Sequence, residues 1–254
     1  MVGCGGTGGF VAEGLCRLLP KKTDILLIDF DRVEEHNLGR QHFYPGDLGK
    51  FKSEALAERL ARNFEREIAY SVFPFNPMMG EDWGDGMRSL EISDALVIGC
   101  VDNAMARRAI AGDMPGMLGW WIDAGNGYHS GQVLIGNSGD RSGLQGAFDI
   151  KHKKVKALPS PAVQLPALLA PAPEVKRRLD CAQAIAEDGQ SPVINQMMAT
   201  LVLDFVHKLT TGRLQWRGVY VDLESGSMSP VPATPEAVAK LTSMKAAELV
   251  KGGK

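Results

Sequence analysis

Cysteine is scarce in this 254-residue sequence, which contains four cysteines and no C-x-x-C pair. They are spread along the chain as Cys4, Cys16, Cys100 and Cys181. Structural zinc sites usually take paired cysteines at short spacing, and disulfide frameworks need a denser set of cysteines in a shorter chain. We therefore expect neither structural zinc nor a disulfide framework.

Long apolar runs and an excess of one charge are also missing. No uninterrupted apolar stretch is long enough to cross a bilayer, and the first residues lack the basic-then-apolar order of a signal peptide. The formal net charge is only -2, so the chain as a whole has no electrostatic attraction to nucleic acid or to a membrane surface. We expect a cytoplasmic protein without nucleic-acid or membrane partners.

Glycine, in contrast, is concentrated at the start of the chain. Gly3, Gly5 and Gly8 fit the G-x-G-x-x-G spacing of a turn between a strand and a helix in nucleotide-binding folds. Glycine lets the backbone turn tightly and approach a ligand closely, and the N–H groups at a helix start favour a phosphate. The loop, with Gly6 and Thr7 inside it, is a candidate phosphate site, although glycine-rich turns also serve purely structural purposes.

A carboxylate at a suitable distance strengthens this interpretation. Asp29 ends the apolar run 25–28, about 20 residues after the loop, where nucleotide-binding folds place the acid that binds ribose hydroxyls. In such folds a buried strand precedes the glycine loop, yet only Met1 and Val2 do so here. We expect the first strand to be truncated or missing, and we interpret the N-terminus as incomplete.

Apolar patterning along the rest of the chain predicts an α/β fold. Continuous apolar runs predict buried strands, and an apolar repeat of three to four residues predicts helices. Expected strands cover residues 24–29, 68–73, 95–101, 120–123, 131–135 and 218–222, and expected helices cover residues 9–19, 51–64, 104–112, 194–209 and 236–251.

Proline density suggests how this fold is organised. Five prolines between residues 159 and 173 predict an extended connection, because proline disfavours both helix interiors and central strands. We therefore divide the chain into a nucleotide-binding core (1–150), a proline-rich connection (151–193) and a C-terminal part of the same domain (194–254).

Polar residues gather where predicted elements meet. Residues 31–41 form a dense polar segment, Lys52 begins a predicted helix, and Asp102 and Asn103 follow a predicted strand. Ligands bind at the carboxyl ends of strands in open α/β sheets, so Asp29 and Asp102 are expected to share one crevice. Each feature also has a structural explanation, since surface lysines are usually solvated and Asp or Asn before a helix commonly caps it.

In this order, the glycine loop, Asp29, the segment from Asn37 to Gln41, Lys52 and the Asp102-Asn103 pair resemble the ThiF/MoeB family of adenylyltransferases, which are related to ubiquitin-activating enzymes. The resemblance covers residues 2–108 and, more weakly, 180–212, and it points to the ThiF-like proteins of plasmid-borne PRTRC gene clusters. It implies a Rossmann-like three-layer fold, with helices on both faces of the sheet and a mixed C-terminal part. It also implies a homodimer that uses ATP and magnesium to activate the C-terminal carboxylate of a small ubiquitin-like or sulfur-carrier protein.

The resemblance also assigns roles to residues. It implies that Arg40 and Lys52 contact the triphosphate, that Asp102 holds the magnesium ion and that Asp29 takes the ribose hydroxyls. Arginine suits a phosphate because its planar fork donates two parallel hydrogen bonds, whereas lysine acts as a mobile point charge. The remaining nucleotide contacts implied by the family pattern are Asn37, Gln41, Asn103 and the loop residues Gly3, Gly5, Gly6, Thr7 and Gly8.

Cys181 lies where some family members carry a cysteine used in sulfur or thioester transfer. The neighbouring Lys176, Arg177 and Arg178 could favour a thiolate, and a buried structural thiol is the alternative. The chain departs from the family in lacking the two C-x-x-C zinc pairs of many members and the N-terminal region from which dimeric relatives supply an arginine to the partner. If that arginine is absent, adenylation is expected to be slow or absent.

Two other functions fit parts of the pattern. The glycine loop and Asp29 also serve nicotinamide cofactors, but an NAD(P)-dependent oxidoreductase leaves Arg40, Lys52 and Asp102 unexplained, and no His and carboxylate arrangement suits hydride transfer. A non-catalytic module of the same fold, which holds a nucleotide or a protein without turnover, is the third hypothesis. Nucleotide competition separates the first alternative from adenylation, and binding without pyrophosphate release identifies the second.

Overall fold

A computed structural model of the protein describes residues 1–75, 95–113, 118–171 and 191–252. Its centre is a sheet that is parallel on one side and antiparallel on the other. The parallel pairs are β1 (Leu26–Ile28) with β2 (Ala69–Ser71) and β3 (Ala95–Gly99) with β4 (Leu118–Asn126). The antiparallel side continues from β4 through β5 (Ser130–Gly136) and β8 (Trp216–Asp222) to β9 (Ser227–Pro232).

Val2 joins the two parallel pairs. It makes a parallel bridge to Ile28 in β1 and another to Gly99 in β3. Its N–H donates to the carbonyl of Ile98 at 2.8 Å, and its carbonyl accepts from the N–H of Cys100 at 2.8 Å. A single residue thus occupies the place of a central strand, which confirms the expectation of a truncated first strand.

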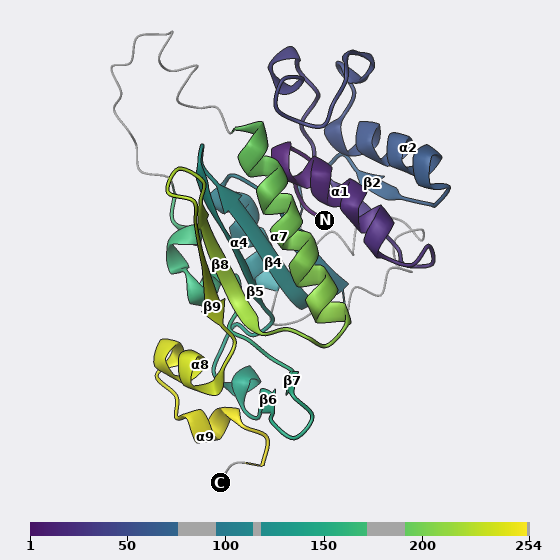
Figure 1. Cartoon of the computed structure of the whole chain (residues 1–254). Helices are drawn as coiled ribbons and strands as arrows, with labels where there is room; N and C mark the ends of the chain where they lie inside the picture. The colour runs from purple at the N-terminus through teal and green to yellow at the C-terminus, as the bar shows by residue number, and fades with distance from the viewer. Residues whose placement is uncertain (76–94, 114–117, 172–190, 253–254) are drawn as a thin grey trace.

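The chain terminus beside Val2 is itself packed into the sheet. The Met1 amino group donates to the carbonyl of Leu26 at 2.7 Å, and the Met1 carbonyl accepts from the N–H of Ile28 at 2.9 Å. Burial lowers the pKa of this amino group, because removing water disfavours its charged form. Figure 1 accordingly shows the N-terminus in the interior of the molecule, beneath the helices.

Helices cover both faces of the sheet, as expected for a three-layer α/β fold. Helices α1 (Gly6–Leu18) and α7 (Pro192–Thr210) lie side by side on one face, next to α2 (Lys52–Phe64), and α7 crosses β4 and β5 (Figure 1). Helix α4 (Ala104–Asp113) packs against β3 on the opposite face, together with α5 (Pro161–Gln164).

The core between these layers is apolar and fully enclosed. Helix α1 contributes Val11 and Leu15, β4 contributes Ile122, and α7 contributes Val202 and Phe205, all at most 3 % exposed. Burial of such side chains is the main favourable term in folding, at about 1.5–3 kcal/mol each. The core therefore fixes α1 and α7 against the strands that carry the polar residues described below. Within the described residues, no helix combines the length and apolar character needed to span a membrane.

A small unit combines a hairpin between β5 and β8 with the C-terminal part of the chain. It contains the hairpin of β6 (Phe148–Asp149) and β7 (Lys154–Val155) and the helices α8 (Pro235–Thr242) and α9 (Ala246–Leu249), which a bridge between Phe148 and Val250 connects. Short 3-10 turns complete the described elements: η1 (Glu35–Asn37), η2 (Pro45–Asp47), η5 (Ser142–Leu144) and η6 (Pro166–Leu169).

Three expectations from the sequence are wrong. The proline-rich connection is not simply extended, because Pro161 and Pro166 each open a short helical turn, where a missing N–H costs nothing. Residues 223–235, where no strand was expected, contain β9, which is at the edge of the sheet and so tolerates proline. The predicted helix 236–251 is divided into α8 and α9, because Ser243 adopts a left-handed conformation with φ 54° that ends α8.

The close contact between α1 and the chain start leads to a prediction about stability. A methyl group on Gly8 would lie 2.0 Å from the carbonyl oxygen of Gly3, and backbone cannot move aside as a side chain can. We expect Gly8→Ala to lower the free energy of unfolding by roughly 1–3 kcal/mol, measured by urea denaturation.

The matched control is Gly112→Ala in α4, where a methyl group meets none of the described residues within 4 Å. Because alanine favours helix over glycine by about 0.5–1 kcal/mol, this variant should be as stable as the wild type or more so. Equal stability of the two variants would contradict the packing assigned to Gly8.

Candidate functional site

A cavity of about 680 Å³ opens at the carboxyl ends of β1 and β3 and at the start of α1. This volume lies within the range typical of small-molecule sites. Asp29 and Asp102 both line it, as their positions at strand ends predicted. The other predicted site residues that line the cavity are Gly3, Gly5, Gly6, Thr7, Asn37, Arg40, Gln41, Lys52 and Asn103.

Two predicted residues are not part of this lining. Gly8 lies behind the cavity wall, packed against Gly3. Cys181 lies outside the residues that the structure describes.

The start of α1 forms a wall suited to an anion. Its first turn carries no acidic residue, and no side chain in the described part of the chain caps it. A methyl group added to Gly5 would meet only the Gln41 side chain, at 3.8 Å or more, so the protein leaves the space beside Gly5 open. Gly3 has φ 89° and lies against the Cys100 carbonyl, which requires glycine there. Free N–H groups and the positive end of the helix dipole favour a phosphate at this wall.

Asp29 holds the glycine loop in place. Its Oδ2 accepts the N–H of Cys4 at 2.6 Å, and its Oδ1 accepts the N–H of Asp31 at 2.9 Å. Burial raises the pKa of the Asp29 carboxyl, while these two donors act in the opposite direction. Because an ionised carboxylate can accept about four hydrogen bonds, two accepted bonds leave capacity for hydroxyl groups of a ligand.

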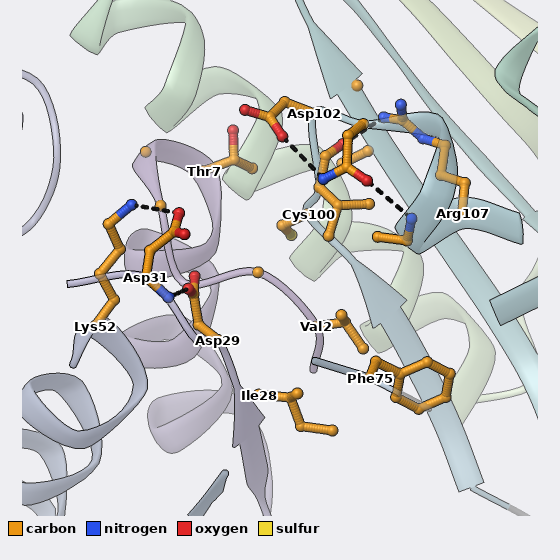
Figure 2. Close-up of a pocket in the computed structure, with 18 of the residues that line it drawn as sticks. Val2, Thr7, Ile28, Asp29, Asp31, Lys52, Phe75, Cys100, Asp102 and Arg107 are labelled. Carbon is orange, nitrogen blue, oxygen red and sulfur yellow. Dashed lines mark hydrogen bonds and ion pairs between the residues drawn. The ribbon is translucent and has the colours of Figure 1, made fainter. Parts of the chain in front are cut away.

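Lys52 is paired with a carboxylate that the sequence analysis did not single out. Its Nζ lies 3.0 Å from Oδ2 of Asp31, and its N–H donates to the Asp31 carbonyl at 2.8 Å. The Lys52 side chain is only 10 % exposed, whereas that of Asp31 is 56 % exposed. Figure 2 shows the two side chains pointing toward each other at one side of the cavity. Asp31 therefore fixes the position of the lysine ammonium group at the cavity wall.

Arg40 offers a second positive charge. It is partly buried and lines the cavity, and within the part of the chain that the structure describes its guanidinium has no carboxylate partner. Its main chain is held in the polar segment by a hydrogen bond from its N–H to the Asn37 carbonyl at 3.2 Å.

The residues on either side of Arg40 have different environments. Asn37 is buried, and its Oδ1 accepts the N–H of Glu34 at 2.9 Å, which stabilises η1. Oε1 of Gln41, in contrast, is buried without a hydrogen-bond partner among the described residues. An unsatisfied buried acceptor is costly, so a donor from a ligand at this position would stabilise Gln41.

Asp102 and Asn103 perform separate tasks at the end of β3. Oδ1 of Asn103 accepts the N–H of Ala106 at 2.8 Å, so the capping explanation holds for Asn103. Among the residues that the structure describes, the exposed Asp102 carboxylate accepts only a long contact of 3.4 Å from Nδ2 of Asn103. It projects over the cavity near Thr7 (Figure 2).

This donor set suits a magnesium ion shared with a ligand. Among the described residues, no three His, Cys, Asp or Glu side chains form a metal cluster. Magnesium usually keeps several waters and is bound by one or two carboxylates together with substrate phosphates. The Asp102 carboxylate, an oxygen ligand close to the phosphate wall, fits that requirement.

A buried ion pair that sequence reasoning missed supports this strand end. Nε of Arg107 lies 3.1 Å from both carboxylate oxygens of Asp123, and the Arg107 guanidinium also donates to the Val101 carbonyl at 2.6 Å. Burial raises the pKa of Asp123 to about 6, against the opposing effect of Arg107. Asp123 was predicted as the end of a buried strand, and only its charge within an apolar run signalled a further role.

The thiols near the cavity are poorly suited to act as nucleophiles. Burial raises the pKa of Cys100 to about 12 and that of Cys4 well above its ordinary value. Burial also raises the pKa of Cys16, which lies on α1. Because the thiolate is the reactive form, burial disfavours a nucleophilic role for these three thiols.

The cavity changes character from one end to the other. In Figure 2, Val2, Ile28 and Phe75 form an apolar end, Asp29 follows, and Thr7 and Asp102 lie toward the opposite, polar end. An apolar surface, a hydroxyl acceptor and an anion-binding wall therefore succeed one another within a single cavity.

The raised pKa of Asp123 predicts a pH dependence of stability. Between its ordinary value of 3.8 and about 6, the folded carboxyl holds a proton that the unfolded chain has released. Stability therefore falls as pH rises through this window. Relative to Asp123→Asn, whose amide cannot ionise, the wild type should lose on the order of 2 kcal/mol of unfolding free energy between pH 4 and pH 6.5.

Chemical denaturation of both proteins across this pH range measures the difference. A constant difference in unfolding free energy would show that Asp123 stays ionised throughout, and a difference that grows in favour of the wild type would reverse the sign assigned to its burial.

Comparison with known proteins finds relatives among curated enzymes and among solved structures. Ubiquitin-like modifier-activating enzyme 5 of Xenopus laevis is 33% identical over 132 residues, which cover 49% of this chain and 32% of that protein. The corresponding enzyme of Dictyostelium discoideum is 36% identical over 118 residues, which cover 43% of this chain and 30% of that protein. The chain thus spans about a third of the length of these relatives.

Solved structures share the fold at low sequence identity. E. coli MccB, in a crystal structure with AMPCPP and MccA, matches with a TM-score of 0.57 at 18% identity, over 91% of this chain and 62% of that one. PaaA matches with a TM-score of 0.57 at 18% identity and the same coverage. The profile of the ThiF family matches residues 1–246. The chain therefore belongs to the ThiF family.

Proposed function

We propose that this chain binds ATP in the described cavity and transfers the adenylyl group to the C-terminal carboxylate of a small ubiquitin-like or sulfur-carrier protein. The observation that carries the proposal is the order of surfaces along the cavity. The apolar end suits adenine, Asp29 suits the ribose hydroxyls, and the start of α1, with Arg40, Lys52 and Asp102 around it, suits the phosphates.

The reaction explains why a base is not required. A carboxylate is already ionised at neutral pH, so its oxygen can attack the α-phosphorus directly. A new carboxylate–phosphorus bond forms, the bond to the bridging oxygen breaks, and pyrophosphate leaves with the electron pair. The barrier arises largely from repulsion between two anions, which positive charge and fixed positioning reduce.

The described residues supply both factors. Lys52 is held by Asp31, and the main chain of Arg40 is held by Asn37, so the two cations approach the phosphate wall from defined positions. A magnesium ion, which Asp102 would hold, neutralises charge on the departing phosphates when it is bound. Asp29 keeps the glycine loop folded around the ligand, because its carboxylate accepts a hydrogen bond from the N–H of Cys4.

The comparisons support the class of partner. The curated relatives are named as activating enzymes of ubiquitin-like modifiers, and MccB was solved with AMPCPP and MccA. By analogy we propose a small protein with an exposed C-terminus as the substrate and a homodimer as the working form. Light scattering on the purified protein tests the latter, and a monomer that retains activity would refute it.

ATP–pyrophosphate exchange with magnesium and candidate small partner proteins tests the reaction directly. Partner-dependent exchange supports adenylation and identifies the carboxylate donor. ATP binding without exchange for any partner would favour the non-catalytic module. Binding of NAD(P), with no measurable affinity for ATP, would favour the oxidoreductase.

Charge variants in the cavity locate the catalytic groups. Asp102→Asn should abolish magnesium-dependent exchange, and Arg40→Ala should slow it on the order of 10²- to 10³-fold, as for loss of one preorganised charge-stabilising donor. Asp24→Asn, at the other end of the strand region, and Arg62→Ala, on the exposed side of α2, are the matched controls and should keep wild-type rates. Undiminished exchange in Asp102→Asn, or a loss under about tenfold in Arg40→Ala, would remove that residue from the mechanism.

We further propose that the acyl group of the adenylate is passed to Cys181. The thiolate sulfur would attack the acyl carbon, a thioester would form and AMP would leave. Cys16, which is buried on α1, provides the control. A thiol-sensitive adduct with the partner should form in the wild type and in Cys16→Ser but be absent in Cys181→Ser. Adduct formation in Cys181→Ser would show that another group accepts the acyl chain.

A further inference from the structure

Asn195 is a fully buried polar residue close to the cavity but not in its lining. It lies in the first turn of α7, which Ser191 caps and Pro192 opens, and its exposed fraction is 0 %. A buried amide carries both a donor group and an acceptor, and each is costly when it has no partner. The contacts of Asn195 therefore indicate what holds it there.

Its side chain contacts three separate segments of the cavity wall. Oδ1 accepts from Nδ2 of Asn126 at 3.1 Å. The Thr7 hydroxyl has one proton to donate, and its Oγ1 lies 3.4 Å from this Oδ1 and 3.2 Å from Oδ1 of Asn126. Nδ2 donates to the carbonyl of Arg40 at 3.3 Å. Thr7 belongs to the glycine loop and start of α1, Asn126 ends β4, and Arg40 lies in the polar segment. All three partners line the cavity, whereas Asn195 reaches it only through them.

The Asn195 amide also requires glycine at position 6, which lies opposite it. A methyl group on Gly6 would lie 2.2 Å from Nδ2 of Asn195 and 2.7 Å from its Cγ. Gly6 therefore lets the amide pack directly against the backbone at the start of α1. The glycine loop is supported from behind by α7, a helix of 19 residues that packs on both α1 and the sheet.

We propose that Asn195 is a positioning residue for the phosphate end of the cavity. It fixes the Thr7 hydroxyl, the Asn126 amide and the main chain of Arg40 in one arrangement. By holding the Arg40 main chain, it also fixes the point from which the Arg40 side chain extends. An asparagine suits this role because its oxygen accepts from Asn126 and can accept from Thr7, while its amide nitrogen donates to the Arg40 carbonyl. Aspartate keeps the shape and the acceptors but loses the donor to Arg40.

This inference rests on the proposed nucleotide function. It concerns the triphosphate of the ligand and not its nucleoside. The contacts of Asn195 lie at the polar end of the cavity. Asn195 does not hold the apolar end or Asp29, whose carboxylate accepts the N–H of Cys4. Loss of the amide should therefore weaken binding of the triphosphate and leave binding of the nucleoside unchanged. A merely structural role would reduce both, because fewer molecules would be folded.

The experiment compares the affinity for ATP with magnesium and for adenosine, both by calorimetry, in wild type, Asn195→Asp and Asn195→Ala. Gln196→Glu is the matched control, since it makes the same change from amide to carboxylate at the next, exposed position of α7. We expect the Kd for ATP to rise about tenfold or more in both Asn195 variants, as for loss of a buried hydrogen bond, with adenosine and the control within about twofold of wild type.

Thr7→Val gives an independent test if the Asn195 variants do not fold. It keeps the shape of the side chain but removes the hydroxyl group that can donate to Asn195. It should also weaken the binding of ATP more than the binding of adenosine. An unchanged ratio of the two affinities in folded variants overturns the positioning role. Failure of the wild type to bind ATP would instead refute the proposed function itself.

Discussion

The arrangement of the cavity depends on the two-sided pairing of Val2 between β1 and β3. Asp29, Asp31 and Lys52 belong to the β1 side, and Asp102 and Arg107 belong to the β3 side. The glycine loop begins at the next residue, and Gly3 donates to the Ile28 carbonyl at 2.9 Å. One residue with backbone bonds in both directions thus sets the spacing between the two groups of charges and the point at which α1 starts.

Buried polar contacts secure what this pairing positions. Arg107 connects α4 to Asp123 in β4 and to the Val101 carbonyl, and Asn195 connects α7 to the glycine loop and the polar segment. Breaking such contacts is costly, because the remaining partner stays away from water without compensation. Their value here is geometric as well as energetic, since each joins a helix on one face of the sheet to backbone at the edge of the cavity.

Sequence patterns predicted the position of those site residues that short stretches of sequence mark. The glycine spacing and strand ends placed Asp29, Asp102 and the loop around one cavity, because the carboxyl ends of parallel strands meet at one edge. Asp123 and Asn195 were not found, because each looks like a core position in its own segment. Asn195 meets Thr7 from a distance of 188 residues in the chain, and no local pattern encodes that contact. The split between α8 and α9 escaped for another reason, since Ser243 has no feature that marks a left-handed residue.

The prolines of β9 limit how the sheet can be extended. Pro230 and Pro232 lie two positions apart in the last strand, so they face the same side. Proline has no N–H, and in an edge strand the side where the N–H would be faces the open edge. An added strand would find most of its backbone acceptors unmatched there. Addition of a strand at β9 is therefore disfavoured, and a partner of this chain would have to contact it through side chains or at another surface.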